Sequence, residues 1–108
     1  MNKTTLLRGV ALGGAAFGVL AAAITQPALA ANPSNGDRLA MRWCAACHVV
    51  SNAQREANTD APPFQEIAKR FSEPGLTTFL LDPHAKMPDM NLTRFEAADI
   101  AAYVSTLK

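Results

Sequence analysis

Apolar and polar residues are distributed unevenly along the chain, and the pattern divides it into two parts near residue 30. Lys3 and Arg8 are the only charged side chains before Asp37, and the sixteen residues from 9 to 24 are all apolar or glycine. Beyond residue 36, apolar residues instead recur three or four positions apart among charged and polar ones. That spacing predicts amphipathic helices, so we expect a helical domain preceded by a segment of a different kind.

The clearest predicted helix covers residues 94–107, at the end of the chain. Thr93 and Glu96 stand at the two positions of a capping box, in which the hydroxyl accepts a bond from a backbone N–H and the carboxylate reaches back to the cap. The apolar positions follow the i, i+3, i+4, i+7 spacing of one helix face: Ile100, Tyr103, Val104 and Leu107. We therefore expect a capped helix that buries this face.

The first predicted helix of the domain begins near Gly36, where Ser34 or Asn35 can serve as its cap. Met41, on this helix, is interpreted as a core residue. One face combines small residues with an aromatic one, so that a second helix could approach closely: Gly36, Ala40, Trp43 and Cys47.

Two further helices are predicted between these, at residues 64–71, which Pro62 and Pro63 open, and at 76–81. The polar stretch 51–61 and the segment 83–92, which contains two prolines, are predicted loops. No stretch has a convincing strand pattern. The predicted fold class is therefore all-α.

The first thirty residues have the three parts of a secretory signal peptide: a basic start, an apolar run and the small-residue ending Ala28-Leu29-Ala30. Cleavage after Ala30 would leave residues 31–108 as the functional domain. The alternative is an uncleaved membrane anchor, but a span needs about 20 predominantly apolar residues, and this run has sixteen. We expect export to the periplasm with no membrane span after cleavage; the alternative is a domain anchored to the membrane and facing the periplasm.

Charge and size narrow the function of residues 31–108. The whole chain has a net charge of +1, but this part carries eight basic and nine acidic side chains, which gives −1. A nucleic-acid-binding domain would need clustered Lys and Arg, so we exclude that class. A domain this small buries little apolar surface and usually needs a disulfide, a metal or a large bound group for stability.

Both cysteines belong to one motif, Cys44-x-x-Cys47-His48, which has the pattern of covalent haem attachment. Two thiols at this spacing can add to the two vinyl groups of one haem, and the adjacent imidazole can bind its iron. A redox dithiol normally follows a strand, and none is predicted here. A zinc site needs a fourth ligand, for which only His84 or a carboxylate is available, and a structural disulfide would leave His48 without a role. We therefore expect one covalently attached haem, which also completes the core.

The residues alone leave the second axial ligand of the iron open. A methionine thioether paired with histidine raises the reduction potential, whereas a second histidine favours a lower one. Each methionine also has an ordinary role as an apolar gap-filler. The candidates are Met41, His84, Met87 and Met90.

The domain resembles the class I monohaem cytochromes c of the small bacterial type. The resemblance extends from residue 36 to the C-terminus and rests on these parts in order: Gly36, Cys44-x-x-Cys47-His48, Ala61-Pro62-Pro63-Phe64, Met87-Pro88 and Tyr103. It implies a small all-α cytochrome c fold of three to five helices around one haem c attached through Cys44 and Cys47. It also implies that the Met of the Met-Pro step is the distal ligand, so it favours Met87 over Met90.

The resemblance further implies that the Pro62 carbonyl accepts a hydrogen bond from His48, and that the first and last helices cross where Gly36 meets Tyr103. Two positions depart from the family pattern. Ala61 stands where glycine is common, and Ala40 stands where an aromatic residue is common. Trp43 is the candidate to fill that volume.

The expected function is electron transfer rather than catalysis. An iron held by His48 and Met87 has six ligands, so it offers no open site for a substrate, and no catalytic constellation is apparent in the sequence. The expected partners are redox proteins: a dehydrogenase, an oxidase or a reductase. Two alternatives stay open, namely a haem subunit of a larger oxidoreductase complex and a ligand-binding haem sensor or enzyme with a labile distal methionine.

Overall fold

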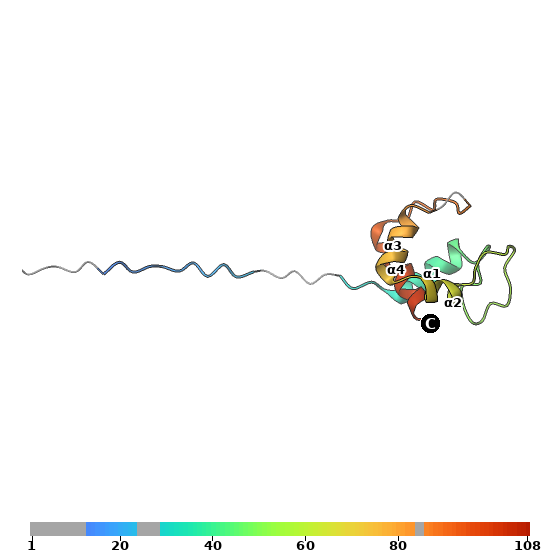
Figure 1. Ribbon diagram of the computed structural model, residues 1–108, viewed down its shortest axis with the longest axis horizontal. Coiled ribbons are helices and arrows are strands. Elements are labelled where there is room, and N and C mark those ends of the chain that lie inside the picture. The colour runs from blue at the N-terminus through green and yellow to red at the C-terminus, as the bar shows by residue number, and fades with distance from the viewer. Residues whose placement is uncertain (1–12, 24–28, 84–85) are drawn as a thin grey trace, which may run out of the picture.

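The computed structural model describes residues 13–23, 29–83 and 86–108. Residues 13–23 contain no helix and lead away from the helical domain (Figure 1), and the side chains of Phe17, Val19 and Leu20 are almost fully exposed. The predicted signal peptide falls partly outside the described ranges. No helix within those ranges combines the length and hydrophobicity needed to cross a membrane.

Four helices and no strand make up the described part of the domain, which confirms the all-α class. The last of them, α4 (Arg94–Ser105), is the helix against which the others pack, α1 most extensively, then α3 and α2. The predicted capping box is present, because the Thr93 hydroxyl accepts from the Glu96 N–H at 3.2 Å and the Glu96 carboxylate accepts from the Thr93 N–H at 2.8 Å. The helix ends two residues earlier than predicted, where Thr106 bonds back to the Tyr103 carbonyl.

Helix α1 (Pro33–Trp43) begins three residues before its predicted start. The cap is Asn32, not Ser34 or Asn35, and its side chain accepts a hydrogen bond from the Asn35 N–H at 3.1 Å. Pro33 occupies the first turn, where a missing N–H has no cost because helices do not bond that group internally. The prediction failed because it placed this proline outside the helix.

The α1–α4 contact forms at Gly36, as the resemblance implies. A Cβ added to Gly36 would overlap the backbone oxygen of Asp99 and lie 2.8 Å from the Tyr103 Cβ. Only Gly36 and Ala40 of α1 are buried there. Met41 and Trp43 are instead 52% and 47% exposed, so the interpretation of Met41 as core and of Trp43 as a filler of the interior was wrong.

Helices α2 (Phe64–Arg70) and α3 (Glu73–Leu81) complete the domain. Helix α2 agrees with its prediction to within one residue. Helix α3 begins three residues before its predicted start, because Ser72 caps it and Pro74 again lies inside the first turn. The 51–61 segment and the described part of 83–92 are loops that extend on the side away from the N-terminal segment (Figure 1).

Candidate functional site

A cavity of about 720 Å³ lies between the end of α1, the two loops and the inner faces of α2, α3 and α4. Ligand and cofactor pockets are typically about 300–1,000 Å³ in volume. The lining includes all five residues predicted for the site: Cys44, Cys47, His48, Pro62 and Met87. Apolar side chains of the three helices form most of the remaining wall, including Phe64, Leu76, Leu80, Ile100 and Val104.

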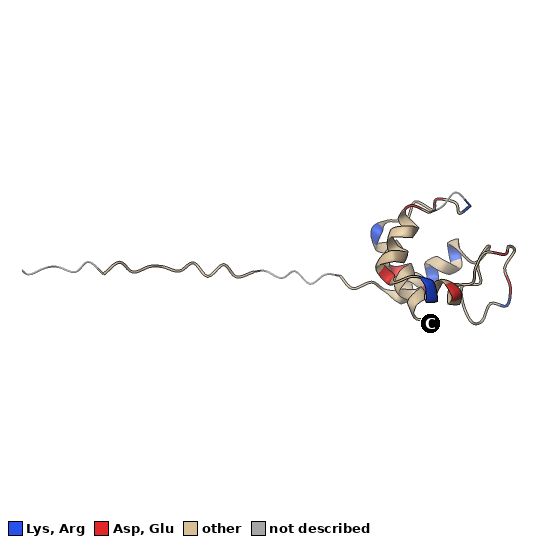
Figure 2. Ribbon diagram, in the orientation of Figure 1, with Lys and Arg blue, Asp and Glu red and all other residues tan. Residues whose placement is uncertain are grey.

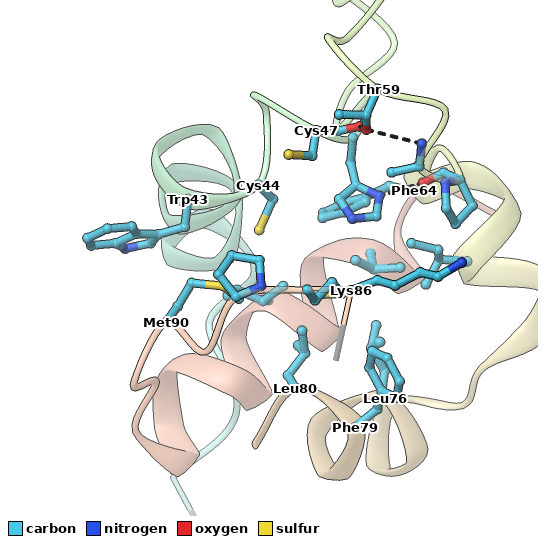
Figure 3. A pocket seen from close by; sticks show the side chains of 18 of the residues that line it. Trp43, Cys44, Cys47, Thr59, Phe64, Leu76, Phe79, Leu80, Lys86 and Met90 are labelled. Atoms are coloured by element: carbon cyan, nitrogen blue, oxygen red, sulfur yellow. Dashed lines mark hydrogen bonds between the residues drawn. The ribbon is translucent and has the colours of Figure 1, made fainter. Parts of the chain in front are cut away.

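The two cysteines lie at the end of α1, and both sulfur atoms face the cavity (Figure 3). Cys44 is the C-cap of α1, where its N–H donates to the Ala40 carbonyl at 2.8 Å. Both are free thiols, Cys44 buried and Cys47 exposed. Burial raises the pKa of Cys44 to about 11, and the nearby Cys47 adds to the shift. Redox dithiols act through a thiolate of lowered pKa, so this site does not favour that alternative.

The buried ring of His48 has a fixed orientation and tautomer. Its Nδ1 lies 2.6 Å from the carbonyl oxygen of Pro62, the contact that the resemblance implies. A carbonyl can only accept, so Nδ1 must be the donor of this bond, which leaves Nε2 for another partner. The ring also packs against Phe64, with centroids 5.6 Å apart. The chain therefore holds the ring with Nε2 as the nitrogen available to bind a metal.

The backbone carbonyls around the motif are all hydrogen-bonded, since every carbonyl from residue 44 to residue 50 accepts a bond. That of Cys44 is bonded within the turn itself, by the N–H groups of Cys47 and His48. The donors to the other six, in the order of the acceptors, are Gln54 Nε2, the Asn58 N–H, Thr59 Oγ1, Gln54 Nε2 again, the Phe64 N–H and the Tyr103 hydroxyl.

This frame around the motif was not predicted from the sequence. The 51–61 stretch was predicted only as a polar loop, yet Gln54 and Thr59 both reach back to the motif from it. Neither residue belongs to a sequence pattern that distinguishes it from other polar loop residues.

On the opposite wall, the structure places both Met87 and Met90 at the cavity, each partly buried. Met87 also packs against the hydrophobic core. Met41 lies on the exposed side of α1 and is not part of the lining, while His84 lies outside the described residues. The geometry thus reduces the described candidates for the distal ligand to two methionines.

Trp43 occupies the rim of the cavity next to Cys44 (Figure 3). The guanidinium carbon of Arg42 lies over the indole ring, 4.9 Å from its centroid, in a cation–π contact. Almost half of the side chain is exposed. The aromatic residue therefore covers one edge of the site rather than filling the helix interface.

The chemistry of these groups fits a haem. Two thiols and an imidazole face one cavity, its walls are largely apolar, and a thioether is available on the other side. A zinc site of four protein ligands is not supported, because within the described ranges no three His, Cys, Asp or Glu side chains are grouped to hold a metal ion. The two thiols needed for covalent attachment and the imidazole needed to bind the iron all line this cavity.

Comparison with known proteins agrees with this chemistry. Residues 33–108 match the family described as cytochrome c. The chain is also 50% identical over 105 residues to cytochrome c-552 of Bradyrhizobium diazoefficiens, which covers 94% of this chain and 95% of that protein. No solved structure gives a significant match. The Cys44-x-x-Cys47-His48 motif therefore implies covalently bound haem c, and the chain belongs to the cytochrome c family.

Proposed function

We propose that this protein is a periplasmic electron carrier in which His48 and Met87 bind the iron of one haem c attached to Cys44 and Cys47. The observation that carries the proposal is the single cavity to which all four side chains contribute, with the His48 ring already held by Pro62. The similarity to a cytochrome c-552 supports electron transfer.

The bound haem supplies a one-electron Fe(III)/Fe(II) couple, and the chain's own residues determine how that couple is held. The Pro62 carbonyl fixes the plane of the His48 ring and increases the basicity of Nε2 by withdrawing the Nδ1 proton toward itself. The apolar walls keep water from the site, which favours the less charged ferrous state. With His48 and Met87 both binding the iron, no open position would remain for a substrate.

Met87 is the proposed distal ligand for two reasons. It belongs to the Met-Pro step that the family resemblance identifies, and it packs against the hydrophobic core, which limits its motion. Met90 is the alternative on the same wall.

The proposed partners are a dehydrogenase that supplies electrons and an oxidase or reductase that accepts them. Figure 2 shows basic and acidic residues interspersed along the ribbon of the helices and loops. Without one dominant sign of charge, steering toward a partner should be weak. We expect association rates that fall only slightly as salt increases; a steep fall would contradict this part of the proposal.

Location in the periplasm is proposed from the N-terminal segment. Its basic start, apolar run and Ala28-Leu29-Ala30 ending are those of a cleavable export signal. Cleavage after Ala30 would release the domain that begins at Ala31, one residue before the cap of α1.

The test is the mass and absorption spectrum of the full chain produced in a bacterium that exports proteins and attaches haem. The expected product begins at Ala31, carries the mass of one haem and shows the spectrum of a low-spin, methionine-ligated cytochrome c. Its reduced form should not bind carbon monoxide readily at neutral pH, because Met87 holds the sixth position. Rapid carbon monoxide binding would instead support a ligand-binding haem protein with a labile methionine.

Single cysteine variants provide the control for covalent attachment. In Cys44→Ala or Cys47→Ala one thioether cannot form, so we expect haem attachment to be weakened or lost. If the unaltered protein carries no covalently bound haem, the proposal is contradicted. If a catalytic protein co-purifies stably with it, the alternative of a haem subunit in a larger complex is favoured.

A further inference from the structure

The side-chain amide of Gln54 contacts four points of the backbone around the haem motif. Its Oε1 accepts from the Val50 N–H at 2.9 Å. Its Nε2 lies 3.0 Å from the carbonyl oxygens of Ala45, His48 and Glu56. We call residues 44–50 the attachment segment. One partly buried side chain, that of Gln54, thus joins the start and the end of this segment to the loop that follows it.

The orientation of this amide is determined by its neighbours. The Val50 N–H can only donate, so it requires the oxygen of Gln54, and the carbonyls can only accept, so they require the nitrogen. A flipped amide would oppose donor to donor and acceptor to acceptor at every contact. The two halves of the Gln54 amide therefore have separate tasks, which separate substitutions can remove.

His48 is held at two points. The Pro62 carbonyl fixes its ring through Nδ1, and Gln54 holds its own carbonyl. If the backbone of His48 moved, the 2.6 Å bond from its ring to Pro62 would lengthen as well, because Pro62 belongs to a different segment. Loss of the Gln54 bond to His48 would therefore be expected to weaken the bond between His48 and Pro62 as well.

We propose that Gln54 is a positioning residue that holds the attachment segment in the geometry needed for thioether formation and for iron binding by His48. The inference rests on the proposed function, since it takes His48 to be an iron ligand. Two thiols must meet two vinyl groups of one rigid ring, and reactions of this kind depend strongly on the placement of both partners. The Gln54 amide supplies this placement at Ala45 and His48, the residues that directly follow the two cysteines.

The test compares holo-proteins with matured haem: the unaltered chain, Gln54→Met, Gln54→Glu and the control Gln65→Met. Gln65 is a suitable control because its Nε2 also donates a hydrogen bond, at 2.7 Å, but to the side chain of Asn52 outside the motif. NMR of the reduced state measures hydrogen exchange at the Val50 amide and at His48 Nδ1. Potentiometric titration measures the reduction potential.

We expect Gln54→Met to accelerate both exchange rates roughly tenfold or more, as expected for the loss of a partner in a partly buried bond. The potential should rise, because a weaker bond to Pro62 makes the His48 imidazole a poorer electron donor to ferric iron. An ionised Gln54→Glu keeps the acceptor and loses the donors. It should retain slow exchange at Val50 and show fast exchange at His48, whereas Gln65→Met should match the unaltered protein in all three measurements.

The proposal is wrong if Gln54→Met unfolds more easily but keeps the potential and the His48 Nδ1 exchange rate of the unaltered protein. Gln54 would then be a structural residue only. If Gln54→Met does not fold, Gln54→Glu decides: fast exchange at His48 supports the proposal, and an unchanged rate overturns it. Failure of the proposed function itself would show separately, as a spectrum of the unaltered holo-protein without histidine and methionine ligation.

Discussion

The two loops that border the cavity are built in different ways. On the attachment side, every carbonyl of residues 44–50 accepts a hydrogen bond: that of Cys44 from within the turn, and the other six from the following loop, the Phe64 N–H and Tyr103. On the methionine side, the described part of the 83–92 loop depends on proline rings and on a turn in which the Asp89 carboxylate accepts from the Asn91 N–H at 2.8 Å. Asn91 there adopts a positive φ of 50°, which asparagine tolerates better than most residues.

This difference separates what the polypeptide determines from what the haem must complete. On the attachment side, hydrogen bonds within the chain set the backbone geometry. Loss of an iron ligand on the other side of the haem should therefore leave this geometry largely intact. On the methionine side, a bond from Met87 to iron would add a constraint that the polypeptide alone does not supply. This distinction can be tested with variants of the attachment side, of the methionine side and of the α1–α4 contact that supports both.

The largest effect is expected from Gly36→Ala, which acts on the support common to both sides. The added Cβ would overlap the Asp99 backbone oxygen and force α1 away from α4. We expect the holo-protein to lose about 3 kcal/mol or more of its free energy of unfolding, measured by denaturant titration. Gly75→Ala is the matched control, because its nearest neighbour is the Ser72 hydroxyl at 3.1 Å. It should change stability by no more than about 1 kcal/mol, and a similar loss in both variants would refute the argument.

The next effect concerns the methionine side alone. Met87→Ala should abolish the methionine–iron absorption signature and lower the reduction potential by roughly 0.1 V, within the roughly 0.8 V range that axial ligands span. The haem should stay attached to Cys44 and Cys47, and the Val50 amide should remain protected from exchange. Met90→Ala is the control and should leave the spectrum unchanged. The opposite result would assign the distal position to Met90.

A smaller effect is expected on the attachment side from Tyr103→Phe. The hydroxyl of Tyr103 donates to the Val50 carbonyl at 2.6 Å, and the variant leaves this buried oxygen without its partner. We expect a loss of about 1–3 kcal/mol in the free energy of unfolding, with the methionine–iron signature retained. A variant that loses that signature first would show that the two sides are not independent.

The same residue gives the stability of the protein an alkaline limit. Burial raises the pKa of Tyr103 above its ordinary value of 10.0, and the nearby Asp37 adds to the shift. The folded state therefore keeps its proton longer than the unfolded state, so the stabilisation is complete below pH 10 and declines as the pH rises through the folded-state pKa. Denaturant titrations of Tyr103→Phe and of the unaltered protein from pH 8 upward should show a difference in the free energy of unfolding. This difference should narrow as the pH rises through the folded-state pKa of Tyr103.

The smallest effect lies outside both loops, at the start of α4. Hydrogen bonds from the Thr93 backbone and side chain lower the pKa of Glu96 below its ordinary value of 4.5. A depressed pKa stabilises the fold above 4.5, and this contribution is lost as the pH falls through the folded-state value. Glu96→Gln can still form the capping box but does not titrate. Its stability should therefore fall less on acidification than that of the unaltered protein, and parallel losses would contradict the assignment.

Local signals explain what could be predicted from the sequence. The Cys44-x-x-Cys47-His48 motif and the Thr93 capping box are each formed by residues close in sequence, and both are present in the structure. The starts of α1 and α3 were misplaced for one shared reason. Pro33 and Pro74 were treated as breaks before a helix, although each lies in the first turn, where proline is tolerated.

What could not be predicted depends on contacts between distant segments. Trp43 has helical spacing with Gly36 and Ala40, but the close crossing at Gly36 leaves Trp43 beyond the contact and partly exposed. Gln54 acquires its role only because the chain folds back so that one amide meets carbonyls six and nine residues earlier. No local pattern identifies such a residue.

The position of Trp43 also makes the protein its own optical reporter. It is the single tryptophan of the chain, and it stands at the rim of the cavity that fits the haem. A haem absorbs strongly at the wavelengths at which tryptophan emits. A haem bound in this cavity would therefore accept the excitation energy of the indole and quench the fluorescence of the holo-protein almost completely. Because the haem would be attached to the adjacent Cys44, this quenching should persist even when the fold is lost. Emission should therefore mark chains that carry no haem, so that the extent of haem attachment can be followed by light alone.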